Sequence, residues 1–191
     1  MSAVIQPNLL AADEYLRQER LAEFKSEYVN GSVYAMSGGT IDHSRIAGNI
    51  FAILWNQLSG RPCEVFNSDM KVRIDKANVF RYPDVSGLCG PLSFYDDTAD
   101  VYRNPTLIVE VLSPSTEKSD RAEKFTLYKL IDSLKEYVLV RQDRLEVEVF
   151  TRDSEGRWPS VIYNTTESSV PIKSLGCTLV VSQIYDKVTF E

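Results

Sequence analysis

The 191-residue sequence predicts an α+β fold, in which a mixed β-sheet is flanked by helices within one domain covering residues 1–191. Residues 41–58 carry apolar side chains at helical spacing. Residues 106–112 form a short apolar run that is typical of a strand buried on both faces. Between these two runs, residues 68–74 alternate apolar and polar side chains, as a half-buried strand does.

Bulk composition indicates a soluble globular protein with one core, because hydrophobic residues make up 43% and charged residues 25% of the chain. The formal net charge of -6 counts against a surface that is basic throughout, although a local basic groove is compatible with it. The sequence shows no signal peptide and no apolar run of the roughly 20 residues that cross a bilayer, so we expect a cytoplasmic protein. The three cysteines are far apart in the sequence and are expected to be reduced: Cys63, Cys89 and Cys177.

The N-terminal third of the chain predicts a helix, a hairpin and a long helix. Residues 11–20 are amphipathic and helical in pattern. Asn30-Gly31 lies between two β-rich runs, which is the strongest short-range signal for a two-residue hairpin turn. The helix over residues 41–58 has a wide inward face, formed by Ala47, Ile50, Phe51, Leu54, Trp55 and Leu58.

The rest of the chain predicts strands around one further helix. In residues 68–74 the polar side chains form a basic outer face, made of Asp69, Lys71 and Arg73. A turn over residues 75–78 leads into a second strand, 79–88, and Pro83 places that strand at an edge or bends it. The later elements expected are a helix, two strands and a tail of loops and short strands, over residues 119–132, 135–141, 144–151 and 158–185.

Glu110 is the most informative residue, because it lies inside the apolar run 106–112. Alternation places it on the same strand face as Ile108 and Leu112. An ionised carboxylate in such a place is costly unless its pKa rises, a cation pairs with it or a metal ion binds it. Glu110 therefore either belongs to a functional site, or it pairs with a buried arginine or lies at the exposed end of its strand.

Asp84 and Lys124 are the candidates to accompany Glu110. Asp84 follows the proline bend, so two carboxylates on neighbouring strands would converge on one cation, although a Pro-Asp pair is also common in turns. Lys124 extends a buried helix stripe, formed by Leu127, Tyr128 and Ile131. Near a metal ion this lysine would position a water molecule; otherwise its stem follows the edge of the core and its charge reaches solvent.

Four runs of the sequence carry a resemblance to a known family: YPDVSGLCG, NPTLIVEVLSPSTEKSDRAEKFTLYKLIDSLKEYVLV, EYVNGSVYAMSGGTIDHSRIAGNI and SDMKVRI. They resemble the Uma2 family of endonuclease-like proteins, and the resemblance covers roughly residues 10–150. The family looks like a branch of the PD-(D/E)xK nuclease superfamily. The resemblance thus implies the restriction-endonuclease-like fold, a mixed sheet flanked by helices.

The resemblance also implies a site. In the superfamily signature a Pro-Asp pair, here ending at Asp84, precedes Asp/Glu-x-Lys on the next strand, where Glu110 matches the acidic position. Leu112 occupies the lysine position, and in Uma2-like proteins the lysine comes from the following helix, where Lys124 stands. Glu27 matches an acidic position of the N-terminal motif, which in some nucleases of this fold lies near the metal ion; spacing alone makes it a solvent-facing hairpin residue.

The implied activity is hydrolysis of phosphodiester bonds in nucleic acid, with DNA as the expected substrate and Mg²⁺ or Mn²⁺ bound by Asp84 and Glu110. The expected phosphate contacts are three basic side chains, Lys71, Arg73 and Arg121. A homodimer is expected, because nucleases of this fold often pair to cut two strands. The only histidine, His43, is either a core or cap residue or reaches the mouth of the site.

Two other functions remain open. The first is a nuclease fold kept as a non-catalytic binding or scaffold protein, which the acidic net charge and the displaced lysine favour. The second is hydrolysis of another substrate by paired carboxylates, as in glycosidases. Uptake of Mg²⁺ or Mn²⁺ separates the nuclease from the scaffold, and substrate screening separates it from other hydrolases.

Overall fold

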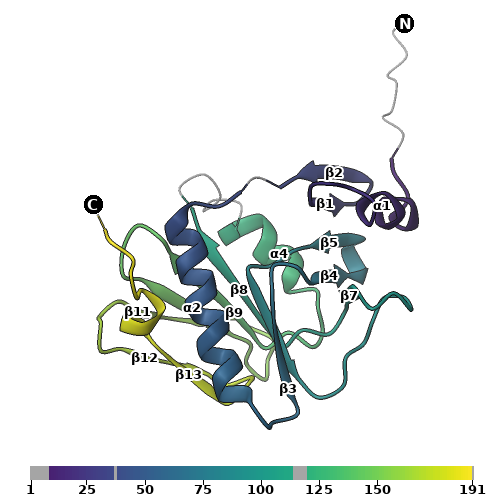
Figure 1. Ribbon diagram of the computed structural model, residues 1–191. Coiled ribbons are helices and arrows are strands. Elements are labelled where there is room, and N and C mark those ends of the chain that lie inside the picture. Colours follow the sequence, from purple (N-terminus) through teal and green to yellow (C-terminus); the bar gives the residue numbers. More distant parts are fainter. Residues whose placement is uncertain (1–8, 37, 114–119, 191) are drawn as a thin grey trace, which may run out of the picture.

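A computed structural model describes residues 9–36, 38–113 and 120–190, and its framework is two β-sheets that meet near residues 82–84 (Figure 1). The N-terminal sheet has the strand order β2-β1-β5-β4-β7. Its strands are β1 (Ser26–Val29), β2 (Ser32–Ala35), β4 (Lys71–Ile74), β5 (Val79–Arg81) and β7 (Val101–Tyr102). All its neighbours are antiparallel except β4 and β7.

The central sheet has six strands in the order β11-β10-β9-β8-β6-β3, and only β8 and β9 run parallel. Its strands are β3 (Cys63–Asn67), β6 (Val85–Cys89), β8 (Leu107–Leu112), β9 (Glu136–Arg141), β10 (Val147–Thr151) and β11 (Ser160–Tyr163). A separate hairpin consists of β12 (Ser169–Ile172) and β13 (Cys177–Val180). The expected α+β class with helices around mixed sheets is confirmed, but the strands form two large sheets rather than one.

The helices form layers around these sheets (Figure 1). They are α1 (Ala12–Glu19), α2 (Ile41–Leu58), α4 (Phe125–Tyr128) and α5 (Val181–Ile184), with a 3₁₀ turn over Asp75–Ala77 and a π-helical turn over Asp120–Lys124. Helix α2 lies across the central sheet beside the β12–β13 hairpin and α5. Among the helices that the structure describes, none is long and apolar enough to cross a membrane.

Helix α2 spans the predicted residues 41–58. It begins where the Thr40 Oγ1 accepts a hydrogen bond of 3.1 Å from the His43 backbone N–H, which is an N-cap. Its buried stripe is narrower than predicted, and consists of Ile46, Ile50, Leu54 and Leu58. Trp55 is 60% exposed, so its place on the inward face was wrong.

Strand β8 is buried on both faces, as predicted, because it lies between β6 and β9 in the middle of the central sheet. Leu107, Val109 and Val111 join the core under α2. Ile108 and Leu112 join the opposite core. The two faces alternate as the sequence predicts, so the carboxylate of Glu110 belongs to the second face.

Pro83 does not lie within one bent or edge strand, as was predicted for residues 79–88. Strand β5 ends at Arg81 and lies between β1 and β4, whereas β6 begins at Val85 and lies between β8 and β3. Because proline has no N–H to donate, it ends one ladder, and the chain continues in the other sheet. Asp84 thus stands at the crossing between the two sheets.

Of the predicted basic outer face of residues 68–74, Lys71 and Arg73 are buried, whereas Asp69 is exposed. The Lys71 Nζ lies 2.9 Å from an Asp100 oxygen, and the Arg73 guanidinium lies 4.3 Å from the centre of the Phe80 ring. This face is covered because Tyr15 of α1 packs on Phe80. Lys71 and Arg73 are therefore engaged inside the protein and do not form the outer face that was predicted to contact phosphates.

The helix predicted over residues 119–132 is shorter in the structure. The described part begins with the π turn at Asp120–Lys124 and continues as α4 to Tyr128, after which tight turns lead to β9. Residue 119 lies outside the described residues. A π turn is wider than an α turn and is often found at functional sites.

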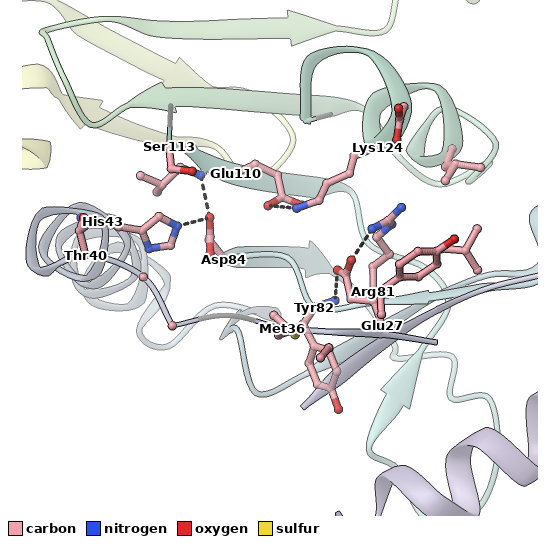
Figure 2. Close-up of a pocket in the computed structure, with 18 residues that line it drawn as sticks. Glu27, Met36, Thr40, His43, Arg81, Tyr82, Asp84, Glu110, Ser113 and Lys124 are labelled. Atoms are coloured by element: carbon pink, nitrogen blue, oxygen red, sulfur yellow. Dashed lines mark hydrogen bonds and ion pairs between the residues drawn. The ribbon is translucent and has the colours of Figure 1, made fainter. Parts of the chain in front are cut away.

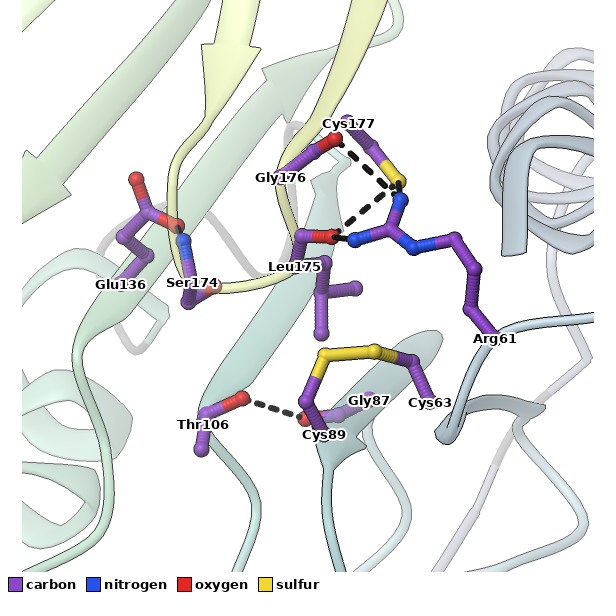
Figure 3. The surroundings of a disulfide bond; sticks show 10 residues. All are labelled: Arg61, Cys63, Gly87, Cys89, Thr106, Glu136, Ser174, Leu175, Gly176 and Cys177. Carbon is purple, nitrogen blue, oxygen red and sulfur yellow. Dashed lines mark hydrogen bonds between the residues drawn. A yellow bond between two sulfur atoms is a disulfide. The ribbon is translucent and has the colours of Figure 1, made fainter.

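Cys63 and Cys89 form a disulfide bond, so the expectation that all three cysteines are reduced was wrong (Figure 3). The two residues are direct partners in the antiparallel β3–β6 pair, with a Cα–Cα distance of 3.9 Å. Sequence spacing did not reveal this pairing, because it arises from the sheet register. Cys177 is free and buried, next to the guanidinium of Arg61.

Candidate active site

A cavity of about 550 Å³ opens between the N-terminal end of α2, both sheets and the Lys124 segment. Six charged side chains line it: Glu27, Arg81, Asp84, Glu110, Glu123 and Lys124. Figure 2 shows that four of them come from the two sheets around the crossing at residues 82–84. The structure therefore brings all four candidate site residues of the sequence, Asp84, Glu110, Lys124 and Glu27, to one cavity.

Glu110 is buried, with only 3% of its surface exposed, and both carboxylate oxygens have partners. The Lys124 Nζ lies 3.2 Å from Oε2, and the Tyr128 hydroxyl donates a hydrogen bond of 3.0 Å to Oε1. Glu110 is thus not at an exposed strand end, and its cationic partner here is the predicted lysine. The ion pair and the hydrogen bond offset the cost of burying this carboxylate.

Tyr128 is a hydrogen-bond donor to Glu110 that the sequence interpretation treated only as an apolar member of the helix stripe. Burial raises the pKa of Tyr128 well above its ordinary value, and the negative charges of Glu110 and Glu27 raise it further. The hydroxyl therefore keeps its proton and donates a hydrogen bond to the carboxylate. Tyr128 fixes the orientation of Glu110.

Asp84 lies next to Glu110 because of the sheet register. Val85, the first residue of β6, is paired with Val109 of the antiparallel strand β8. Asp84, which directly precedes β6, therefore comes opposite Glu110. The Asp84 Oδ2 accepts a hydrogen bond of 2.7 Å from the Val111 backbone N–H, which ties the side chain to β8. The same oxygen lies 3.2 Å from the His43 Nε2.

His43 faces the cavity from the first turn of α2 (Figure 2). Of the two interpretations left open, the structure thus favours a histidine that reaches the site. Its contact with Asp84, together with the Val111 N–H, holds one oxygen of that carboxylate in place.

Glu27 is not a solvent-facing hairpin residue, because only 8% of its surface is exposed. The Glu27 side chain lines the cavity, where it lies against Arg81 of the neighbouring strand β5. The Glu27 Oε2 accepts a short hydrogen bond from the Arg81 Nη1, and Oε1 lies within 3.4 Å of the Tyr82 backbone N. Sequence reasoning missed Arg81, although it stands directly before the Tyr-Pro-Asp run.

Arg121 does not line the cavity, so the prediction that it contacts phosphates beside the site is not supported by its position. Its guanidinium lies 2.5 Å from a Glu148 oxygen and 3.4 Å from a Glu146 oxygen. Glu148 belongs to β10, and Glu146 directly precedes that strand. None of the three basic residues predicted to contact phosphates reaches the cavity.

Mg²⁺ prefers oxygen ligands, and the cavity offers it carboxylates. Within residues 9–36, 38–113 and 120–190, no group of three His, Cys, Asp or Glu side chains is arranged to hold a metal ion. Mg²⁺ is, however, commonly held by one or two carboxylates together with water and substrate phosphates. Asp84 and Glu110, at adjacent register positions in an open cavity, fit that mode of binding.

Comparisons with known proteins agree with the fold. Residues 12–182 match the model of the Uma2 family, described as "Putative restriction endonuclease". An uncharacterized protein of Synechocystis sp. is 36% identical over 95% of this chain and 94% of its own length, and a second one is 34% identical over 83% and 89%. The crystal structure of a "putative nuclease" belonging to DUF820 from Anabaena variabilis superposes with a TM-score of 0.75 at 18% identity, covering 94% of this chain and 99% of that one.

Proposed function

The chain belongs to the Uma2 family, and from that premise we propose that it is an endonuclease, a hydrolase that cleaves phosphodiester bonds in nucleic acid with the help of a divalent metal ion. The observation that carries the proposal is the cluster in the cavity. Two carboxylates, Asp84 and Glu110, lie opposite each other where β6 begins beside β8, and Lys124 contacts Glu110. Carboxylates that hold a metal ion, together with a nearby cation, are a set of groups suited to metal-dependent hydrolysis of a phosphate ester.

Asp84 and Glu110 are the residues that would hold Mg²⁺ or Mn²⁺. A metal ion bound there supplies a water of lowered pKa and neutralises charge on the phosphate. The chain's own contribution is to hold the ligands in fixed orientations. The Val111 N–H and His43 fix Asp84, and Tyr128 fixes Glu110.

Lys124 has two tasks in this proposal. In the free protein it neutralises the buried Glu110. With substrate bound, its ammonium group orients the attacking water or stabilises the negative charge that develops on the phosphoryl oxygens. Water adds to phosphorus, the bond from phosphorus to the leaving sugar oxygen breaks, and that oxygen takes up a proton. Glu27 contributes to the same site because it accepts a hydrogen bond from Arg81 and holds that side chain.

We also propose a substrate, an oligomeric state and a location for the protein. We expect DNA as the nucleic acid, a homodimer that carries one site for each strand, and a cytoplasmic location. Light scattering coupled to size-exclusion chromatography measures the oligomeric state directly. A monomer at micromolar concentration in the presence and absence of duplex DNA would remove the dimer from the proposal.

Calorimetric titration with Mn²⁺ and with Mg²⁺ tests the site, with wild type beside Glu110→Gln and plasmid nicking measured on the same samples. Glu155→Gln is the matched control, because it removes a carboxylate that is exposed and outside the cavity. We expect metal binding and nicking by wild type and by the control, and loss of both in Glu110→Gln. Equal cleavage by wild type and Glu110→Gln would contradict the proposed site.

A second candidate function is a nuclease fold that binds nucleic acid or protein without cleaving. The net charge of -6 and the burial of Lys71 and Arg73 favour it, because they leave little basic surface. The same titration separates the two functions. A wild-type protein that takes up neither Mn²⁺ nor Mg²⁺ is the scaffold, and one that takes up metal and nicks DNA is the enzyme.

A further inference from the structure

We propose that Arg81 is a substrate-binding residue, and that it contacts a phosphate of the nucleic acid in the cavity. The inference rests on the proposed function and names a recognition element of the same site. Arg81 ends β5 two residues before Pro83 and lines the cavity together with Glu27, Glu110 and Lys124. Figure 2 shows its guanidinium beside Glu27 and on the same side of the cavity as Lys124.

The hydrogen bonds of Arg81 leave part of its guanidinium without a protein partner. An arginine side chain carries five N–H donors. Nη1 donates to Glu27, whereas Nε is buried and has no hydrogen-bond partner. Among the described residues none accepts a hydrogen bond from Nη2. A buried donor without a partner costs free energy, so it needs an explanation, and a ligand oxygen is one.

The position of the unpartnered atoms suits a phosphate. Nε and Nη2 form one edge of the planar guanidinium, and such an edge binds two oxygens of a phosphate or carboxylate side by side. Glu27 occupies the donor on the other side of the group, at Nη1. Nε is covered in the free protein, so a phosphate that approaches Nη2 from the cavity completes the pair after a small rotation of the side chain.

The charge of Arg81 persists in this buried place. Burial itself lowers the pKa of the guanidinium, but the negative charge of Glu27 and the neighbouring Tyr128 and Glu110 outweigh this effect and raise it. Arg81 and Lys124 are the two Arg or Lys side chains among the described residues that line the cavity. Since Lys124 already contacts Glu110, Arg81 is the cation with donors to spare for a substrate phosphate.

Glu27 is a positioning residue in this arrangement. It holds the Arg81 Nη1, and its second oxygen lies close to the Tyr82 backbone N, so it ties the guanidinium to β1 and β5. An arginine held in this way loses less side-chain entropy when it binds a phosphate.

The test measures binding separately from cleavage. Fluorescence anisotropy of fluorescein-labelled DNA and RNA oligonucleotides is recorded in EDTA at a series of NaCl concentrations, with the 191-residue chain and Arg81→Met. Arg157→Ala is the matched control, because it removes one positive charge from an exposed side chain outside the cavity. The double variant Glu27→Leu/Arg81→Met keeps the net charge and avoids a buried unpaired carboxylate.

We expect Arg81→Met and the double variant to bind about ten to a hundred times more weakly than wild type, and the slope of log affinity against log salt to fall by about one. Arg157→Ala should match wild type. If Arg81→Met, or the double variant where the single one fails to fold, binds with the affinity and slope of wild type, the inference about Arg81 is wrong while the nuclease proposal stands. A wild-type protein that binds neither oligonucleotide, in EDTA or with added Mn²⁺, overturns both.

Discussion

The buried ion pair between Glu27 and Arg81 makes a quantitative prediction about stability. Each side chain is about nine-tenths buried, and the pair joins two neighbouring strands of the N-terminal sheet. Glu27→Leu leaves a buried guanidinium without its counter-charge, and Arg81→Met leaves a buried carboxylate in the same position. We expect both single variants to be strongly destabilised, and the double variant Glu27→Leu/Arg81→Met to be close to wild type.

The expected magnitudes come from the burial of the pair. Removing one partner of a buried ion pair costs about 3–5 kcal/mol, whereas replacing both partners by apolar side chains of similar volume is close to neutral. For a chain of 191 residues each kcal/mol shifts the melting temperature by about 2–4 °C. The single variants should therefore melt about 6–20 °C below wild type. Because the singles together lose about 6–10 kcal/mol and the double variant loses little, the coupling free energy between the two substitutions should be about 6–10 kcal/mol.

The assay is urea unfolding followed by tryptophan fluorescence, for wild type, both single variants and the double variant. An exposed pair, Arg157 with Glu155, provides a parallel cycle in which solvent screening leaves no measurable coupling. Additive effects at Glu27 and Arg81, with a double variant as unstable as the sum of the singles, would refute the reasoning. The pair would then be solvated in solution, and its role in presenting a guanidinium to substrate would lose its structural basis.

Ile50→Ala should cost about 2–5 kcal/mol in thermal unfolding, because Ile50 is fully buried on the inner side of α2, whereas Trp55→Ala on the exposed side of the same helix should cost far less. Replacing Cys63 and Cys89 by serine should lower stability by about 3–4 kcal/mol in calorimetry under oxidising conditions, because the bond closes a loop with a sequence separation of 26 residues; equal stability of variant and wild type would argue against the bond. Ion pairs and hydrogen bonds overcome the opposing effect of burial and lower the pKa of Asp100 from 3.8 to about 2, so Asp100→Asn should destabilise the protein at neutral pH. A carboxylate with a lowered pKa stabilises above its unfolded value, so the difference should shrink between about pH 4 and pH 2; a difference that does not depend on pH would exclude this cause.

Local periodicity was sufficient to predict several elements. Helix α2 has the predicted bounds, and β8 is the predicted buried strand, because both patterns are complete within fewer than twenty residues. The inward position of Lys124 also followed from a helical repeat. Each of these predictions depends on neighbours in the sequence, which the sequence shows directly.

Contacts between segments that lie far apart in the sequence could not be predicted from local periodicity. Lys71 and Arg73 alternate with apolar residues like exposed side chains, but α1 folds over that face of the sheet. Cys63 and Cys89 meet only because β3 and β6 are antiparallel in one particular register. Glu27 is buried because its carboxylate pairs with Arg81 of β5, which lies more than fifty residues away in the sequence. In each case the decisive partner lies far away in the sequence.

Among the residues of the cavity, some were predicted from local patterns and others were not. Asp84 and Glu110 were recognised from the cost of a carboxylate in an apolar strand and from the Pro-Asp pair. Arg81 was not, because an arginine in a strand is an unremarkable pattern until its partners are known. Tyr128 was assigned to the core, and its hydroxyl contact with Glu110 joins two elements across 18 residues of sequence.

The crossing at residues 82–84 has a consequence for how such proteins can be recombined. Arg81 is the last residue of one sheet and Asp84 directly precedes the first strand of the other, so a segment of two residues sets their spacing. One inserted residue would force Arg81 or Asp84 to shift by one position, and a shift of one residue turns a side chain to the opposite face of its strand. A chimera that takes its N-terminal sheet from one relative and its central sheet from another should keep its site only if this segment is transferred without a change in length. The proposed substrate contact at Arg81 and the proposed metal ligand Asp84 would then have to be transferred together.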